Sequence, residues 1–143
     1  MRKVLIVSHG RLASGIKSSV EVLTGDASAI TAIDAYLDDR DYTLDVRDFI
    51  DGCGPADEAI VFTDLLGGSV FQKVVTQDLA EKSVMHVTGT NLAVVLECLL
   101  TPEPLTPTTV DQICHVASTQ LKRVEVQDMG KGEESPLEDD FFA

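Results

Sequence analysis

The sequence is poor in basic residues and in long apolar runs. Lysine and arginine total 11 against 24 aspartates and glutamates, which gives a formal net charge of −13, and no basic cluster offsets it. Nucleic acids and anionic membranes are therefore poor partners, because both are bound through positive charge. No apolar run approaches the length of a membrane span, and no leader-like segment opens the chain. We expect neither membrane insertion nor export.

Cysteine is also scarce. The three cysteines, Cys53, Cys98 and Cys114, are an odd number, lie far apart and stand in apolar surroundings. This pattern predicts reduced, buried thiols and a cytoplasmic protein. There is no Cys-x-x-Cys motif and no histidine pair at ligand spacing, so we predict no metal site and no bound organic cofactor.

What the chain does contain is enough apolar material for one folded domain. It has 143 residues, of which 44% are hydrophobic. The last segment, 130–143, differs in composition, because it carries five acids and one lysine, a net charge of −4, with interspersed glycine and proline. We predict a domain over 1–129 and an acidic, disordered tail over 130–143.

Strand and helix patterns alternate strictly through the domain. Apolar runs predict strands at 4–7, 29–33, 59–63 and 83–87, and helical periodicity predicts helices at about 12–24, 42–51, 69–82, 92–100 and 109–121. Segment 123–127 alternates between apolar and polar residues instead, which is typical of an edge strand with one buried face. The sequence therefore predicts an α/β fold: a doubly wound, mostly parallel sheet of four parallel strands with a C-terminal antiparallel edge strand.

The third predicted strand ends in a turn that suits an anion. Asp64 follows the apolar residues of that strand, and Gly67 and Gly68 allow a sharp turn with open backbone before Ser69 begins a helix. Ser69 and Gln72 have the spacing of a capping box. A carboxylate beside a helix N-terminus with free N–H groups favours an anionic ligand, and phosphate above all.

The first predicted strand supplies a nucleophile on the same edge of the sheet. It ends in Ser8, His9 and Gly10, and strands one and three usually flank the point where strand order reverses. A neutral imidazole is a competent nucleophile, and Asp64 would fix its tautomer and stabilise its developing positive charge. The amides of Gly67, Gly68 and Ser69 would then neutralise an incoming phosphoryl group, giving a phosphohistidine.

These residues also have ordinary structural interpretations. His9 could be a solvated turn residue, Asp64 a turn acid, and Ser69 nothing more than a helix cap. His86 lies in the middle of a predicted strand and His115 within a predicted helix, so we interpret both as structural.

Three motifs together resemble a known family. They are Val7-Ser8-His9-Gly10 followed by Leu12-Ala13-x-Gly15, the run Thr63-Asp64-Leu65-Leu66-Gly67-Gly68-Ser69, and Thr88-Gly89-Thr90-Asn91-Leu92. In this order and on matching elements they resemble the IIA domain of the mannose-type bacterial sugar phosphotransferase system, over about residues 3–127.

The resemblance implies a definite function. The histidine matching His9 would take a phosphoryl group from the phosphocarrier protein HPr and pass it to a IIB component for sugar uptake. The aspartate matching Asp64 would orient the imidazole, and the serine matching Ser69 would contact phosphate with nearby amides. Such domains are often homodimers that exchange their last strand, which 123–127 would match. Leu66 stands where members often carry an aromatic residue, and Val70 where proline usually follows, both at the expected rim of the site.

Two other functions that use an aspartate or a histidine at a strand end fit this sequence less well. A receiver domain phosphorylated at Asp64 would need an acidic pair after the first strand to hold Mg²⁺, where this chain has Ser8 and His9. A histidine phosphatase would need an arginine before its histidine, whereas Arg11 follows. A regulatory or sensor domain phosphorylated at His9 without a transport role stays open. We predict a phosphotransferase that carries a phosphohistidine intermediate.

Overall fold

The computed structural model describes residues 1–126 of the chain. The predicted tail at 130–143, the domain boundary at 129 and Gln127 lie outside the described residues. The sheet contains β1 (Arg2–His9), β2 (Ile30–Ala35), β3 (Glu58–Thr63) and β4 (Met85–Thr88), all parallel, in the order β2-β1-β3-β4. The helices are α1 (Leu12–Thr24), α2 (Thr43–Asp51), α3 (Ser69–Val75), α4 (Leu92–Leu100) and α5 (Pro107–Ser118), with a 3₁₀ turn η1 (Ala80–Lys82). The predicted α/β fold with four parallel strands is confirmed.

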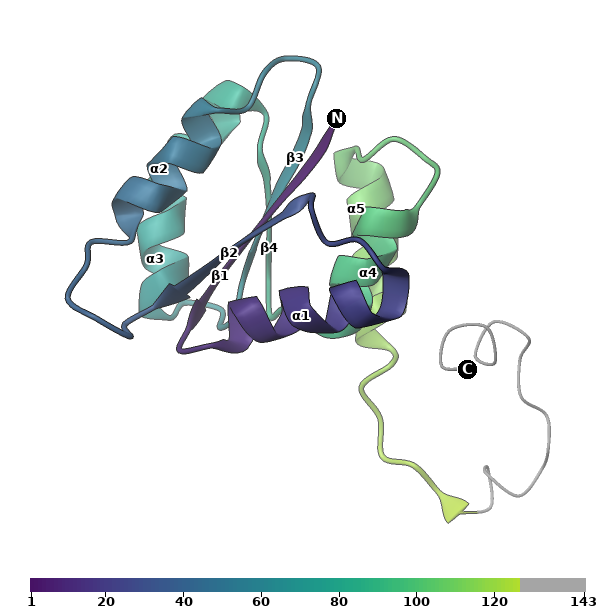
Figure 1. Ribbon diagram of the computed structural model, residues 1–143. Helices are drawn as coiled ribbons and strands as arrows, with labels where there is room; N and C mark the ends of the chain where they lie inside the picture. Colours follow the sequence, from purple (N-terminus) through teal and green to yellow (C-terminus); the bar gives the residue numbers. More distant parts are fainter. Residues whose placement is uncertain (127–143) are drawn as a thin grey trace.

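Helices cover both faces of the sheet. Helices α2 and α3 lie on one face, and α1, α4 and α5 on the other (Figure 1). Residues of β1 alternate between the two apolar cores, with Val4 and Ile6 facing one and Leu5 and Val7 facing the other. Both sets are fully buried, which is why the strand is a continuous apolar run rather than an alternating one.

The strand order brings the carboxyl ends of β1 and β3 together. The chain passes from β1 to β2 on one side of β1 and then crosses to β3 on the other side. The strands β1 and β3 are therefore neighbours at the point where the strand order reverses. Val7 pairs with Thr63 in the register, and the next residues past that pair approach each other at the strand ends. Ligands of open parallel sheets bind at this kind of edge.

The described chain does not add the predicted antiparallel strand to its own sheet. Residues 121–125 have no regular structure, and the side chains of Leu121, Val124 and Val126 are largely exposed. Sheet formation needs a partner for the backbone, and no other segment of residues 1–126 pairs with this one. Exchange of 123–127 between subunits stays a prediction.

Two predicted helices have different bounds. The helix predicted over 69–82 ends at Val75, because Thr76 and Gln77 both turn their side chains back to the carbonyl of Lys73, which competes with helical bonding. The last helix, predicted over about 109–121, begins earlier, at Pro107, whose fixed φ suits the first turn, and ends earlier, at Ser118. Within residues 1–126, no helix is both long enough and apolar enough to cross a bilayer.

Candidate active site

His9 is the last residue of β1, with its imidazole half-exposed. The preceding residue, Ser8, is buried, and its hydroxyl accepts the backbone N–H of Ala13 at 2.7 Å. Since no side chain caps α1 at its N-cap position, this bond ties the strand end to the first turn of the helix. Gly10, with φ +58°, makes the sharp bend between them. His9 is therefore presented at the sheet edge by a rigid strand and a bound turn.

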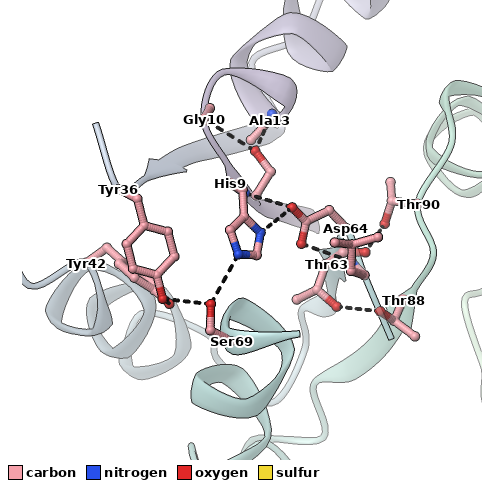
Figure 2. A network of polar contacts seen from close by, with 12 residues as sticks. His9, Gly10, Ala13, Tyr36, Tyr42, Thr63, Asp64, Ser69, Thr88 and Thr90 are labelled. Atoms are coloured by element: carbon pink, nitrogen blue, oxygen red, sulfur yellow. Dashed lines mark hydrogen bonds and ion pairs between the residues drawn. The ribbon is translucent and has the colours of Figure 1, made fainter. Parts of the chain in front are cut away.

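Asp64, directly after β3, holds the histidine through two hydrogen bonds. One carboxylate oxygen, Oδ2, accepts the backbone N–H of His9 at 2.7 Å and lies 2.8 Å from Nδ1 of its ring (Figure 2). A carboxylate can only accept, so Nδ1 must carry hydrogen. The other ring nitrogen, Nε2, then has a lone pair, which is the state a nucleophile requires.

The environment keeps Asp64 ionised. Burial opposes its charge, since the side chain is only 8% exposed. The hydrogen bonds from the backbone and ring of His9, together with the N–H of Leu65, outweigh that cost and hold the pKa of Asp64 below its ordinary value. The carboxylate is thus a fixed negative charge behind the imidazole.

The turn after Asp64 needs both of its glycines, for different reasons. Gly67 has φ +75°, a conformation that other residues adopt at a cost. A Cβ on Gly68 would lie 3.3 Å from two atoms of Leu65 and 3.8 Å from Cε1 of His9. The amide of Gly68 donates to the carbonyl of Leu65 at 3.0 Å, so it closes the turn and, contrary to the prediction, is not free for a phosphoryl group. The backbone can therefore run close beside the imidazole.

Ser69 does not form the predicted capping box. It is the first residue of α3, Gly68 is the N-cap, and no side chain caps this helix end. The reason is that the serine hydroxyl turns to the site instead: Oγ lies 3.1 Å from Nε2 of His9 and accepts the hydroxyl of Tyr36 at 2.9 Å. The interpretation of Ser69 as a helix cap is wrong, and the hydroxyl contacts the ring nitrogen that Asp64 leaves free.

The site also contains two tyrosines, Tyr36 and Tyr42, which were not predicted from the sequence. Tyr36 follows β2, and its ring stacks on the imidazole of His9 with centroids 5.3 Å apart. Its hydroxyl also lies 3.1 Å from that of Tyr42, which is buried. One signal was present in the sequence: Tyr36 lies three residues after the strand predicted at 29–33, and parallel strands end at the same edge as His9 and Asp64.

The strand end of β4, also polar and on the same edge, does not contact His9 within the described residues. The hydroxyl of Thr63 donates to that of Thr88 at 3.0 Å and lies 2.7 Å from Nε2 of His86, while Thr90 donates its hydroxyl to the carbonyl of Thr63. Burial lowers the pKa of His86, which disfavours its charged form. These groups brace β3 behind Asp64.

The two residues that depart from the resemblance lie in different places. Leu66 is 77% exposed, as expected at the rim of the site, but Val70 is fully buried among the residues under α2 and α3. The expectation that Val70 lies at the rim is wrong, because α3 turns this position toward the sheet. The change from proline at Val70 therefore affects packing rather than a surface that partners touch.

The cysteines fit their prediction in most respects. None of the three forms a disulfide, Cys53 and Cys98 are buried, and Cys114 is half-buried. Burial raises the pKa of the Cys98 thiol to about 12, so it stays protonated.

Comparisons with known proteins agree with this architecture. A IIA protein of the phosphotransferase system associated with a fucose utilization operon of Streptococcus pneumoniae is 26% identical, with a TM-score of 0.75 over 88% of this chain and 95% of that one. Component EIIA of the phosphotransferase system from Streptococcus agalactiae is 25% identical, with a TM-score of 0.74 over 86% of this chain and 97% of that one. A proposed permease of the phosphoenolpyruvate-dependent sugar phosphotransferase system from Klebsiella pneumoniae is 26% identical, with a TM-score of 0.76 over 85% of this chain and 90% of that one.

A search of curated proteins gave no match. The family model of the fructose IIA component of the phosphotransferase system matches residues 3–113, which include every residue of the site described above. That span is more than half of the chain. The chain belongs to the family of phosphotransferase system fructose IIA components.

Proposed function

We propose that this chain accepts a phosphoryl group from phospho-HPr on Nε2 of His9 and passes it to a IIB component, as part of sugar uptake. Membership of the IIA family supports a role in sugar phosphotransfer. The observation that carries the finer proposal is the geometry of His9: Nδ1 bonded to Asp64, and Nε2 directed outward beside the hydroxyl of Ser69.

The proposed step is a transfer between two nucleophiles. The lone pair of Nε2 attacks phosphorus, a P–N bond forms, and the bond from phosphorus to the donor breaks with its electron pair leaving on the donor. The imidazole gains positive charge as the bond forms, while Nδ1 keeps its hydrogen. Asp64 stabilises that charge from 2.8 Å away and needs no rearrangement to do so. The reverse sequence hands the group to the IIB component.

The turn at 67–69 would hold the transferred group. Gly67 and Ser69 would offer backbone N–H groups, and Ser69 would add its hydroxyl once Nε2 is phosphorylated and no longer accepts a hydrogen bond. Gly68 would contribute by its missing Cβ, which leaves space beside Cε1 of His9. These three residues are the phosphate-binding set that we propose.

Exposed leucines next to His9 would form the surface that partners touch. Leu12 begins α1 directly after the histidine turn, and Leu65 and Leu66 follow Asp64; Leu12 is about half-exposed and the other two are more exposed. Apolar side chains at the centre of a docking surface exclude water from the transfer. We propose that HPr and the IIB component bind here in turn, and that the protein works in the cytoplasm as a homodimer.

Asp64 is a poorer phosphoryl acceptor than His9, which argues against a receiver-like function. Its side chain is 8% exposed against 42% for His9, and its oxygens already accept three hydrogen bonds. Phosphorylation there would displace the contacts that hold His9. A regulatory role for phosphohistidine at His9 uses the same chemistry and differs only in its partner.

Intact mass tests the proposal. The protein is incubated with phosphoenolpyruvate, enzyme I and HPr, with each component omitted in turn. We expect one acid-labile phosphoryl group that requires HPr and is absent from His9→Ala. His86→Ala is the matched control, because this histidine lies behind the site, and it should be labelled like the wild type. A label that survives in His9→Ala would contradict the proposal.

A further inference from the structure

We propose that Tyr36 is a positioning residue of this site, which acts on Nε2 of His9 through the hydroxyl of Ser69. The inference deepens the proposed function and rests on it for its kinetic consequence. It concerns a residue that lies outside the three motifs of the family resemblance and follows β2, whereas His9 ends β1 and Asp64 follows β3.

Tyr36 is held in an unfavourable backbone conformation. Its φ is +67°, in the left-handed region that bulky residues rarely adopt. Such a conformation persists only where surrounding contacts enforce it. Here it turns the side chain from the end of β2 across the sheet edge, so that the ring stacks on His9 at 30° between the planes and the hydroxyl reaches Ser69 (Figure 2).

The hydrogen bonds around Ser69 have one consistent direction. Asp64 fixes hydrogen on Nδ1, so Nε2 of His9 can only accept, and the Ser69 hydroxyl must donate to it. Ser69 then accepts from Tyr36, whose hydroxyl in turn can accept from Tyr42. A hydroxyl has a single hydrogen, so the donation from Tyr36 leaves that of Ser69 pointed at the reactive nitrogen.

The same orientation serves the phosphorylated state. When Nε2 bonds to phosphorus it stops accepting, and the hydrogen of Ser69 becomes available to a phosphoryl oxygen in the same direction. Without Tyr36, the serine hydroxyl would be free to rotate away from the site. The tyrosine thus pre-aims a donor at the place where negative charge arrives.

Tyr36 is about half-exposed, and contacts with Lys73 and Tyr42 favour one position of its ring. The ammonium of Lys73, one turn after Ser69 on α3, lies 5.5 Å from the centroid of the Tyr36 ring and 4.9 Å from that of Tyr42. Cation–π contact of this kind favours the observed ring positions. Tyr42 also packs edge-on against Tyr36, with centroids 5.4 Å apart.

The kinetic test is a double-mutant cycle of single-turnover transfer from phospho-HPr. We expect Tyr36→Phe to slow transfer about tenfold, less than the loss for a donor that touches the reacting group directly. Ser69→Ala should slow it more. If Tyr36 acts through Ser69, Tyr36→Phe should add almost nothing in the Ser69→Ala background. The half-saturating concentration of phospho-HPr and the melting temperature should not change.

Tyr42→Phe is the matched control, since it also removes a tyrosine hydroxyl, but one that lies one hydrogen bond further from His9. Its transfer rate should fall less than that of Tyr36→Phe. A wild-type rate in Tyr36→Phe, or losses that multiply fully in the double variant, would overturn the proposal.

A second measurement separates this proposal from the proposed function. The ¹⁵N shift of Nε2 in unphosphorylated protein reports the hydrogen bond that this nitrogen accepts, with no need of HPr. Tyr36→Phe should move the shift in the same direction as Ser69→Ala, and Tyr42→Phe should move it less. An unchanged shift in Tyr36→Phe refutes the role of Tyr36 even if His9 is phosphorylated. Absence of labelling in the wild type refutes the proposed function while the shifts still decide this inference.

Discussion

Two polar regions lie on the same edge of the sheet. The first is formed by the ends of β1 and β3, and the second by the end of β4. At the first, His9 and Asp64 bond to each other and leave Nε2 directed outward beside Ser69. At the second, the Thr88 and Thr90 hydroxyls bond to Thr63. The two regions differ in where their polar side chains form hydrogen bonds. The reactive site keeps a half-exposed ring nitrogen whose partner is the exposed hydroxyl of Ser69, whereas the polar groups at the end of β4 bond to the buried Thr63.

The largest effect should come from the carboxylate behind His9. Asp64→Asn should slow phosphoryl transfer by about 10²- to 10⁴-fold, because an amide no longer enforces the Nδ1–H tautomer or stabilises the imidazolium. The matched change at the other strand end, Thr88→Val, should leave the transfer rate within about twofold, since Thr63 keeps its contact with His86. Single-turnover kinetics measure both. Equal losses in the two variants would show that the strand ends do not differ as described.

Two glycines with nearly the same positive φ sharpen the comparison. Gly67 has φ +75° and Gly89 has φ +72°, and a Cβ at either position meets no atom within 4 Å. Alanine at either should therefore lower the free energy of unfolding by about 1–2 kcal/mol. Only Gly67→Ala should also slow transfer, because relaxing that turn displaces Ser69 and the amides beside His9. Urea unfolding and transfer rates on both variants test this, and a slow Gly89→Ala would count against it.

A smaller effect is expected from the helix cap beside β4. The side chain of Asn91 accepts the backbone N–H of Val94 at 2.8 Å and caps α4. Asn91→Ala should lower the free energy of unfolding by about 1 kcal/mol and leave transfer unchanged. Chemical denaturation and the transfer assay measure the two quantities. Slowed transfer in a fully folded variant would mean that the third family motif contributes to the site directly.

The smallest effect is the acid dependence that Asp64 adds to stability. Its folded pKa lies below the unfolded value of about 3.9, so the unfolded chain binds the proton more readily. The resulting stabilisation is fully present above about pH 4 and is lost as pH falls through the folded pKa. Unfolding free energies from pH 6 downward should thus fall less steeply in Asp64→Asn than in wild type. Asn91→Ala should keep the wild-type steepness.

Much of the fold could be predicted from apolar patterns alone. Uninterrupted apolar runs such as Val4–Val7 predicted strands buried on both faces, and the two helical layers account for that burial. The bounds were less predictable. The end of α3 at Val75 was missed because apolar periodicity does not show that the side chains of Thr76 and Gln77 bond to the Lys73 carbonyl, although these bonds are local.

The site followed from the sequence in part. His9, Asp64 and Ser69 were found because each stands at a strand end or beside a turn, and parallel strands bring such positions together. The bonding of Ser69 was predicted wrongly, because its spacing to Gln72 resembles a capping box while its neighbours in space, His9 and Tyr36, are far away in sequence. Tyr36 and Tyr42 were missed for the same reason.

The sequence by itself determined the α/β class, the order of elements and the residues that can carry the chemistry, because those depend on periodicity and on the capacity of each side chain. The tertiary structure decided which polar strand end presents a half-exposed nucleophilic nitrogen, which hydroxyl donates to which atom, and that Tyr36 completes the site. These depend on distances of a few ångströms between residues from different strands. No local pattern encodes them, since they arise only when the sheet has formed.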